Sequence, residues 1–397
     1  MRVLLVHNRY RSASPGGEDR VVDQELAALS GAGHTVERFE RCNDEIAGRS
    51  LVGRALVPAE VVWSETSRRG LTATLRAVRP DVVHVHNTFP LLSPSVLYAC
   101  RAQRVPVVMT VHNYRLVCSS GILFRDGAIC HDCVGRFPLP AVRHGCYRGS
   151  RLATVPLAAG MTAHRRAWRT LVSAYVCPSR SLRDIIVADG LPASRLFVKP
   201  HFVPHVPAPE AAPRGFVLYA GRLAPVKGVD LLMDAWDRYA STAQRGRLRL
   251  LVAGAGPLQN RLAAWTRGRS DAEWVGLVSP SECTSLQSRA HAVIVPSAWE
   301  EAFGLVVVEA MARGVPAVAP AHGSFPELIT DGHDGVLFAP GDAAGLARVL
   351  EDVARRPEHY RALGRAARHT YEERFSPQAN MEHLLSIYRF AIEHPAA

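Results

Sequence analysis

The sequence lacks the long apolar run that a membrane-spanning helix needs. Its longest uncharged apolar stretch, about residues 152–163, falls far short of the roughly 20 residues that cross a bilayer. Its first residues lead from Met1 into a strand-like segment, without the basic region, apolar core and cleavage site of a secretory signal. We therefore expect a cytoplasmic protein, whose contact with the inner face of the cell membrane is at most peripheral.

A disulfide framework is not expected either, because the eight cysteines would lie in a reducing compartment. Half of the cysteines are scattered and are interpreted as small buried apolar side chains: Cys42, Cys100, Cys177 and Cys283. The other half crowd into one short segment: Cys118, Cys130, Cys133 and Cys146. This clustering needs a separate explanation.

The cysteine-rich segment has the spacing of a zinc site. Cys130 and Cys133 have the two-residue gap that lets two thiolates bind one metal. Cys118 and Cys146 flank this pair, with eleven and twelve residues intervening. Glycines and prolines in between indicate loops that core packing alone would not order, and one structural zinc would supply the missing stability. The alternatives are four free buried thiols, pairs oxidised only on isolation, and a redox-active Cys-x-x-Cys.

Composition and charge bound the number of domains and the kind of partner. The chain has 397 residues, of which 48% are hydrophobic, and single cores rarely exceed about 250 residues, so two domains are expected. The 47 Lys and Arg exceed the 36 Asp and Glu, and the net charge of +11 favours anionic partners. Arginines are spread over many expected helices rather than clustered with aromatic residues, which argues against nucleic acid.

Short β-branched runs alternate with helical patterns, which is typical of βαβ units and a parallel sheet. Strands are expected in the first half at residues 3–7, 35–38, 82–86, 107–111, 174–177 and 196–199. In the second half they are expected at residues 216–220, 248–253, 273–275, 292–295 and 317–319. The sequence thus predicts an α/β protein with two doubly wound parallel sheets.

A proline-rich stretch at residues 204–214 indicates a linker between two domains. We predict an N-terminal Rossmann-like domain over residues 1–203, with a cysteine-rich insertion at residues 115–150. A second Rossmann-like domain, expected to bind the nucleotide, covers residues 215–376. The last residues, 377–397, are expected to form a helix that packs on the first domain.

Basic residues follow the first expected strand of the second half. Arg222 comes directly after Gly221, and Lys227 and Gly228 lead into a helix. Ligands of parallel sheets bind beyond the carboxyl ends of the strands. Two cations and a helix N-terminus on one side of a pocket suit a diphosphate, although a solvated basic loop would look the same.

Acidic residues follow a later strand of the same half. Residues 296–304 form a loop that contains Glu301 and ends at Gly304, and Glu309 lies on the helix expected at residues 305–312. Gly304 allows close backbone approach at a helix start, where free N–H groups favour a phosphate. The two carboxylates can accept hydrogen bonds from hydroxyls on either side of a sugar diphosphate. Surface glutamates that flank a core helix would show the same spacing.

These motifs occur in one order along nearly the whole chain: the Gly16-Gly17 loop, His112 after a strand, Arg222 and Lys227, then Glu301 and Glu309. In this order the sequence resembles family 4 of the glycosyltransferases, which are retaining enzymes of the GT-B fold, with two Rossmann-like domains facing a central cleft. The block at residues 296–316 is the most specific part of the resemblance, and residues 219–228 support it.

The resemblance implies transfer of a sugar from a nucleotide diphosphate sugar to a glycan, lipid-linked or small-molecule acceptor. It implies that Arg222 and Lys227 hold the diphosphate. Glu309 would accept from the ribose hydroxyls, and Glu301 would hold the transferred sugar. The other implied donor contacts are Gly16, Gly17, Gly276, Phe303, Gly304 and Leu305. The sequence has no Asp-x-Asp motif of metal-dependent transferases, so no catalytic cofactor is expected.

The resemblance also implies histidines on the acceptor side. His112, which precedes Asn113, occupies the position of a family histidine that contacts the sugar or the acceptor; a histidine satisfied inside a domain interface is the alternative. His84 and His86 alternate along one expected strand, and we expect them to face opposite sides of the sheet. His86 is then predicted to line the acceptor side of the pocket, as is Asn113, and His84 is predicted to be structural.

Other partners and other functions stay open. Residues 49–69 and 151–169 mix apolar residues with arginines, and such segments either bind anionic lipid surfaces or form helices with a solvated basic face. A nucleotide-sugar epimerase of the same architecture would convert its substrate without any acceptor. A non-catalytic anion- or nucleic-acid-binding protein would bind random DNA in a salt-sensitive way and would not bind sugar nucleotides.

Overall fold

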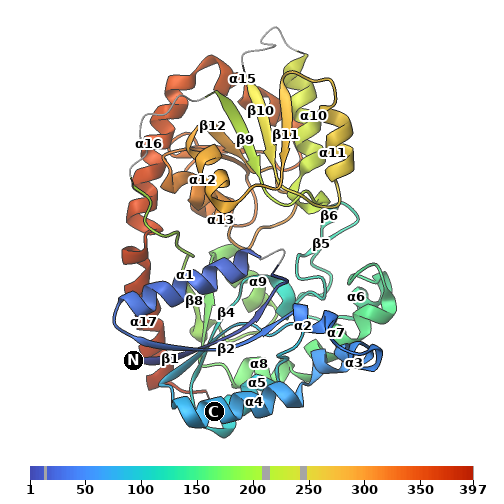
Figure 1. Cartoon of the computed structure of the whole chain (residues 1–397), viewed down its shortest axis with the longest axis vertical. Helices are drawn as coiled ribbons and strands as arrows, with labels where there is room; N and C mark the ends of the chain where they lie inside the picture. Colours follow the sequence, from blue (N-terminus) through green and yellow to red (C-terminus); the bar gives the residue numbers. More distant parts are fainter. Residues whose placement is uncertain (13–15, 208–214, 242–247, 397) are drawn as a thin grey trace. The chain divides into compact units, whose positions relative to one another are not determined.

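The computed structural model describes residues 1–12, 16–207, 215–241 and 248–396, and the chain divides into two compact units (Figure 1). Unit 1 comprises Met1–Leu123, Cys130–Phe202 and Pro377–Ala397, and unit 2 comprises Phe124–Ile129 and Val203–Ser376. Among the described residues, no helix combines the length and the apolar character needed to cross a membrane.

Unit 1 is built on a six-stranded parallel sheet in the order β2-β1-β3-β4-β7-β8. Its strands are β1 (Arg2–Arg9), β2 (Thr35–Cys42), β3 (Val82–Asn87), β4 (Val107–Thr110), β7 (Ala174–Cys177) and β8 (Leu196–Val198). Because β2 and β3 pair with opposite sides of β1, the direction of strand addition reverses there. Ligands of open parallel sheets bind at such a reversal, beyond the carboxyl ends of the strands.

The C-terminal helix of the chain belongs to unit 1. In α17 (Pro377–Glu393), Leu384, Ile387 and Tyr388 pack in one core with α1 (Gly17–Gly31) and the sheet. The other helices of the unit are α2 (Asp44–Ala47), α3 (Leu51–Val62), α4 (Glu65–Val78), α5 (Ser95–Ala102), η1 (Tyr114–Leu116), α6 (Leu139–His144), α7 (Arg151–Ala163), α8 (Arg165–Thr170), α9 (Arg180–Ala188) and η2 (Ala193–Arg195). Burial of each large apolar side chain stabilises this core by about 1.5–3 kcal/mol.

Unit 2 is built on a second six-stranded parallel sheet, in the order β11-β10-β9-β12-β13-β14. Its strands are β9 (Phe216–Ala220), β10 (Arg249–Ala253), β11 (Ala272–Gly276), β12 (Ala290–Ile294), β13 (Ala317–Pro320) and β14 (Gly335–Phe338). Its helices are η3 (Pro225–Lys227), α10 (Val229–Ala240), α11 (Gln259–Thr266), α12 (Pro280–Ser288), α13 (Leu305–Ala312), α14 (Phe325–Leu328), α15 (Ala343–Arg355) and α16 (Pro357–Arg374). This is the strand order of dinucleotide-binding folds, and the reversal lies between β9 and β12.

The prediction of an α/β protein with parallel sheets is confirmed, and the structure adds three strands. β14 is four residues long and carries no alternation that would mark it in the sequence. β5 (Phe124–Arg125) and β6 (Ala128–Ile129) form a two-stranded antiparallel hairpin within the cysteine-rich segment. Most of the linker predicted at residues 204–214 lies outside the described residues.

Candidate active site

In unit 2, the basic loop after β9 and the acidic loop after β12 meet at the reversal of the sheet. Gly228 has a φ of 71°, and a Cβ there would lie 1.7 Å from the carbonyl oxygen of Pro296. Only glycine permits this approach. The Ala298 N–H donates to the Val226 carbonyl at 2.9 Å. The two loops are therefore held side by side.

The contact between these loops centres on Glu301. Its Oε1 accepts hydrogen bonds from Lys227 Nζ at 2.5 Å, from Ser297 Oγ at 2.8 Å and from Trp299 Nε1 at 3.0 Å. The side chain of Glu301 is 10% exposed and that of Lys227 is 32% exposed. Charge-assisted bonds of this kind hold the carboxylate in one orientation, while the ammonium still faces solvent on one side.

A third loop, after β13, supports Glu301 through its backbone. The Ser324 N–H donates to the Glu301 carbonyl at 3.2 Å. A Cβ on Gly323, whose φ is 57°, would lie 2.9 Å from the Glu301 nitrogen. His322 Nε2 lies 3.0 Å from the Ser297 carbonyl oxygen. Sequence reasoning missed this loop, although its position directly after an expected strand was a usable signal.

The loop after β10 packs against the start of the basic loop. A Cβ on Gly254 would lie 1.9 Å from the Gly221 carbonyl oxygen. The Gly254 N–H donates at 2.7 Å to the carbonyl of Gly276, which ends β11. Arg222 is exposed, and its carbonyl accepts from the Tyr219 hydroxyl at 2.9 Å. Arg222, Lys227, Gly276 and Glu301 thus follow strands whose carboxyl ends share one edge of the sheet.

Helix α13 begins next to this edge. It starts after Gly304, whose φ is 87° and where a Cβ would lie 2.8 Å from the ring of Phe325. Phe303 is buried and Leu305 is half-buried. Glu309 is buried on the same helix, with Oε2 3.5 Å from Gln287 Nε2 on α12. The structure therefore places the two predicted glutamates on consecutive elements of one loop-helix unit.

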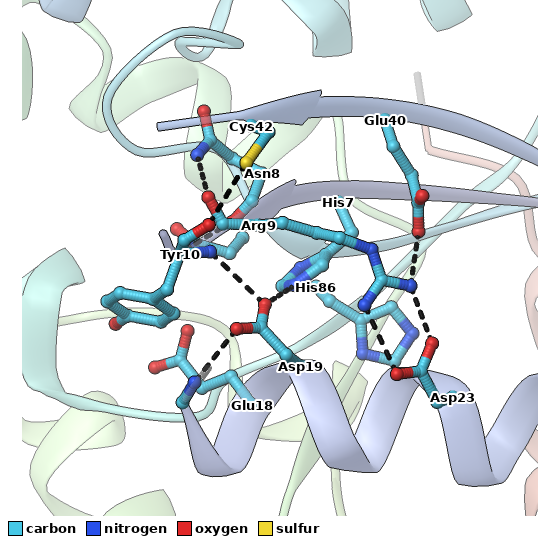
Figure 2. A network of polar contacts seen from close by, with 12 residues as sticks. His7, Asn8, Arg9, Tyr10, Glu18, Asp19, Asp23, Glu40, Cys42 and His86 are labelled. Atoms are coloured by element: carbon cyan, nitrogen blue, oxygen red, sulfur yellow. Dashed lines mark hydrogen bonds and ion pairs between the residues drawn. The ribbon is translucent and has the colours of Figure 1, made fainter. Parts of the chain in front are cut away.

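In unit 1, the loop between β1 and α1 is anchored by Asp19 (Figure 2). Its carboxylate accepts from the Gly16 N–H at 2.8 Å and the Tyr10 N–H at 3.3 Å, and lies 2.7 Å from His7 Nε2. Although burial opposes ionisation, the bonds from His7 and Gly16 lower the pKa of Asp19. A Cβ on Gly16 would lie 2.8 Å from the Tyr10 ring, whereas Gly17 has open space around it.

Glu18, which precedes Asp19, links α1 to the loop after β4. Asn113 Nδ2 donates to Glu18 Oε1 at 2.5 Å. Burial raises the pKa of Glu18. Figure 2 shows its carboxyl group close to the ring of Tyr10. The start of α1 is thereby fastened to the segment that carries His112.

A buried cluster of imidazoles lies behind His112. His112 Nε2 is 3.0 Å from His86 Nδ1 on β3. Glu25 of α1 approaches both His86 Nε2 and His84 Nδ1 with Oε2, at 3.6 Å in each case. Its other oxygen, Oε1, accepts from Lys199 Nζ at 3.0 Å, and both side chains of this ion pair are fully buried.

The prediction that His84 and His86 face opposite sides of the sheet is wrong. Their ring centroids are 4.1 Å apart, and both rings approach the same carboxylate. Side chains alternate along a strand, so residues two positions apart share a face. His84 is held by Thr110 Oγ1 at 2.7 Å and by the Tyr388 hydroxyl at 2.8 Å.

Burial keeps these imidazoles neutral at physiological pH. It lowers the pKa of His84 to about 4 and that of His201, which stacks on His112, to about 3. It also lowers the pKa values of His86 and His112 well below 6.5. Although burial opposes it, the Lys199 ammonium lowers the pKa of Glu25. A neutral His112 can donate with one ring nitrogen and accept with the other.

A pocket lies beside this cluster in unit 1. Its polar wall includes His86, His112, Asn113 and Arg115. Its apolar wall includes Val61, Phe89, Met109, Leu157, Met161 and Trp168. The structure therefore brings together the three residues expected on the acceptor side, and most of the remaining wall is apolar.

Comparisons with known proteins identify the family. The model of Glycosyltransferase Family 4 matches residues 15–205, and that of Glycosyl transferases group 1 matches residues 207–370. The D-inositol 3-phosphate glycosyltransferase of Frankia alni is 30% identical over 423 aligned residues, which cover 95% of this chain and 94% of that protein. The chain belongs to glycosyltransferase family 4.

Other similar proteins agree with this assignment. The glycogen synthase of Mycobacterium tuberculosis is 29% identical, over 93% of this glycosyltransferase and 89% of its own length. The solved structure of Anabaena HepE in complex with UDP and glucose has a TM-score of 0.67 and 17% identity, and the match covers 98% of this chain and 100% of that one. The GT-B fold predicted from the sequence is confirmed.

The glycosyltransferase carries its four clustered cysteines in unit 1, gathered around Cys133. Cys118 and Cys133 are buried, and Cys130 and Cys146 are half-buried. Burial, together with the three neighbouring thiols, raises the pKa of Cys133 to about 11. Among the described residues, one group of at least three potential metal ligands has all its ligand atoms within 4.8 Å of one another, and it consists of Glu25, His84 and His86 rather than of the thiols.

Sequence reasoning missed the buried pair of Glu25 and Lys199. A signal was available, because this glycosyltransferase has only two lysines, Lys199 and Lys227, among 47 basic residues. Each of them binds a glutamate. A compact ammonium fits a small buried space that a planar guanidinium does not. The Lys199 charge also balances Glu25, so the Glu25–His84–His86 cluster does not need a metal ion.

Proposed function

We propose that this glycosyltransferase moves a hexose from a nucleotide diphosphate sugar to an acceptor, with retention of anomeric configuration and without a catalytic metal. The observation that supports this most is the Lys227–Glu301 pair, held between two loops beyond the strand ends of unit 2. The Lys227 ammonium and the Glu301 carboxylate are 2.5 Å apart, and on donor binding the ammonium can bind a phosphate while the carboxylate accepts from a sugar hydroxyl. HepE, with the same fold, was solved with UDP and glucose.

In this proposal, Arg222 and Lys227 neutralise the departing diphosphate, which is the task that a metal ion performs in other transferases. Glu301 accepts hydrogen bonds from the transferred sugar, and Glu309 accepts them from the ribose. The other donor contacts proposed in unit 2 are Gly276, Phe303, Gly304 and Leu305. For Gly16 and Gly17 of unit 1, a donor contact stays a prediction from the family resemblance. The exposed side chain of Arg222 and the solvent-facing side of Lys227 suit a ligand that arrives from solution.

The acceptor is proposed to bind in the pocket of unit 1, next to His112 and Asn113. If His86 Nε2–H points at Glu25, then His86 Nδ1 accepts from His112 Nε2–H. This leaves His112 Nδ1 as a hydrogen-bond acceptor for a hydroxyl group. Glu25 and Lys199 are positioning residues in this scheme, because they act on the tautomer of His112 through His86. We also propose that the enzyme works in the cytoplasm, with at most a peripheral contact to the inner face of the cell membrane.

A ligand screen followed by a transfer assay tests the proposal. Sugar nucleotides with different bases are compared by thermal shift, since a ligand at 100 times its dissociation constant stabilises the protein by about 2.7 kcal/mol. Conversion of the bound sugar nucleotide without any acceptor would identify an epimerase instead. Proton NMR of the first product should show retention, and inversion would contradict that part of the proposal.

Variants at the site sharpen the assay. Glu301→Ala and Arg222→Ala should each lose most turnover and stay folded, because one electrostatic contact of this kind typically contributes about 2.7–4 kcal/mol to lowering the barrier. Arg238→Ala is the matched control, since Arg238 is exposed on α10 and pairs with Asp234. Normal transfer by either folded site variant would remove that residue from the site.

A further inference from the structure

Exposed apolar side chains gather on one part of unit 1. Seven large ones lie on or next to α3, α6 and α7: Leu51, Val52, Leu56, Phe137, Leu139, Leu152 and Val155. Leu51 is 83% exposed and Leu152 is 86% exposed. Scattered single apolar residues are normal on a surface, but a contiguous group on neighbouring helices indicates a partner. These seven residues are called the apolar surface.

On α3 and α7 these side chains form stripes, because their spacing places them on one face of each helix. On α3, the exposed residues Leu51, Val52, Ala55, Leu56 and Ala59 follow one another at intervals that place them on one side of the helix. On α7, Leu152, Val155 and Ala159 do the same. Both helices are capped by a serine hydroxyl, Ser50 on the Gly53 N–H and Ser150 on the Ala153 N–H. The stripes therefore belong to helices with well-formed ends.

Helices α3 and α6 both pack against α7 (Figure 1). Gly160 of α7 lies against the backbone of Val62, and a Cβ at Gly160 would be in ordinary van der Waals contact with the Val62 Cα, at 3.7 Å. His164 Nε2 lies 2.9 Å from the Val62 carbonyl oxygen. The Tyr147 N–H donates to Thr154 Oγ1 at 3.0 Å and ties the end of α6 to α7. The apolar surface is thus left over after unit 1 has packed its own helices.

The helices that carry the apolar surface also carry basic residues. Four exposed arginines lie on or next to these helices: Arg54, Arg143, Arg148 and Arg151. Helices α6 and α7 contain no acidic residue, and the one acidic residue of α3, Glu60, is bound by Arg49 at 2.7 Å. A nucleic acid would not use exposed leucines, and a protein partner would have to be both apolar and acidic. An anionic bilayer offers both features at once.

We propose that the apolar surface of α3, α6 and α7 docks on an anionic lipid bilayer. The leucines insert at the boundary of headgroups and acyl chains, and the arginines bind lipid phosphates. Each basic residue near the surface raises the binding constant about fivefold. The partner is identified by this chemistry alone: a membrane that carries anionic headgroups.

The docking surface adjoins the pocket that the proposed function assigns to the acceptor. Val61 of α3 and Leu157, Gly160 and Met161 of α7 line that pocket, together with His112. One pair of helices therefore presents apolar side chains both to the bilayer and to the pocket. This step rests on the proposed function: if the acceptor binds in that pocket, the arrangement suits an acceptor with a lipid anchor, whose apolar chain passes along the α3–α7 pair.

Vesicle flotation with the full chain tests the docking directly. The protein should bind vesicles of phosphatidylcholine with 30% phosphatidylglycerol at low salt, and it should bind pure phosphatidylcholine vesicles far more weakly. Leu51→Ser/Leu56→Ser/Leu152→Ser should reduce binding by at least tenfold. Leu277→Ser is the matched control, because Leu277 is 76% exposed on unit 2. Equal binding by the triple variant, or no binding of the natural chain to anionic vesicles, would overturn the proposal.

Charge variants and a donor-binding readout complete the test. Arg143→Gln/Arg148→Gln/Arg151→Gln should weaken binding to anionic vesicles about 100-fold, at about fivefold for each charge. Both triple variants should keep the thermal shift caused by the donor. If the proposed function is wrong, the donor will cause no thermal shift in any of these proteins, whereas flotation tests membrane docking alone. A lipid-free dimer that the leucine variant dissociates would show that a second copy covers the surface, and would overturn the proposal.

Discussion

The two units each hold one of the two lysines of the chain, and each lysine pairs with a glutamate, but the settings differ. In unit 1, Lys199 and Glu25 are 3.0 Å apart and fully buried among histidines. In unit 2, Lys227 and Glu301 are 2.5 Å apart, and the lysine is 32% exposed beyond the ends of the strands. The same two residue types therefore form two ion pairs that differ in burial.

Desolvation explains the difference. Two charges taken out of water cost several kcal/mol each, and a buried pair recovers this only while both partners are present. Glu25 and Lys199 must therefore stay together, and they can act only through neighbours such as His86. An ion pair that is partly in solvent costs less free energy to separate, because water can solvate the separated charges. Lys227 and Glu301 can therefore leave each other and bind the phosphate and hydroxyl groups of a ligand.

The largest effect is expected from breaking the buried pair. Lys199→Met leaves the Glu25 carboxylate without its cation in a dry core, which should lower the unfolding free energy by about 3–5 kcal/mol. Urea unfolding measures this directly. The double variant Glu25→Gln/Lys199→Met should recover most of the loss, because it leaves no uncompensated charge. A single variant as stable as the natural protein would show that the pair is not held in a dry core.

A different signature is expected from the pair in unit 2. Lys227→Met should raise the transfer barrier by about 2.7–4 kcal/mol, because the leaving diphosphate loses one preorganised cation. The thermal midpoint without ligand should change little, since the lysine is partly solvated. Steady-state kinetics and thermal unfolding of the same sample separate the two readouts. A large loss of stability with normal turnover would erase the contrast between the units.

The pH dependence of stability should come mainly from unit 1. The folded pKa of His84 is about 4 and its ordinary value is 6.5, so the unfolded chain binds the proton more readily between these values. Unfolding free energy should therefore fall as the pH drops from 6.5 to 4, by at most about 1.4 kcal/mol per pH unit for this residue. The lowered pKa of Glu25 acts in the same direction at lower pH.

Urea unfolding at several pH values tests this. His84→Gln should flatten the slope between pH 6.5 and 4, because the neutral amide cannot take up a proton. His333→Gln is the control, since His333 is exposed in unit 2. An unchanged slope in the His84 variant would assign the pH dependence to other groups.

The smallest effect on donor binding is expected from the cysteine-rich segment of unit 1. One zinc bound by Cys118, Cys130, Cys133 and Cys146 stays a prediction from their spacing, and their gathering around Cys133 agrees with it. The thiols would have to move together by rotation about their Cα–Cβ bonds. Elemental analysis should find about one zinc per chain, with the donor-induced thermal shift unchanged on its removal.

Matched variants locate the metal. Cys130→Ser/Cys133→Ser should lose the zinc, while Cys42→Ser/Cys283→Ser and Glu25→Gln should keep it. Zinc that disappears with Glu25→Gln instead would place the ion at the Glu25–His84–His86 cluster. Metal-free protein that is stable and fully active would contradict the zinc prediction.

Local sequence patterns were sufficient to predict many of the helices, strands and loops. Helix α13 has the predicted bounds, Leu305–Ala312, because Gly304 and the apolar run mark its start and length. The loops that carry Arg222, Lys227 and Glu301 were found because they follow strands with clear β-branched runs. The strand β14 was missed, since its four residues have neither length nor alternation. The roles of all these residues stay predictions until variants are measured.

By itself, the sequence determined the alternation of strands and helices, the parallel sheets and the chemistry at the strand ends, because each depends on short-range periodicity and on glycine positions. Only the tertiary structure decided which side chains meet. Glu25 and Lys199 are 174 residues apart, and His84 reaches Tyr388 across 304 residues. Such contacts depend on strand order and helix packing, which no local pattern encodes. For that reason the buried ion pair, the shared face of His84 and His86 and the apolar surface appeared only with the fold.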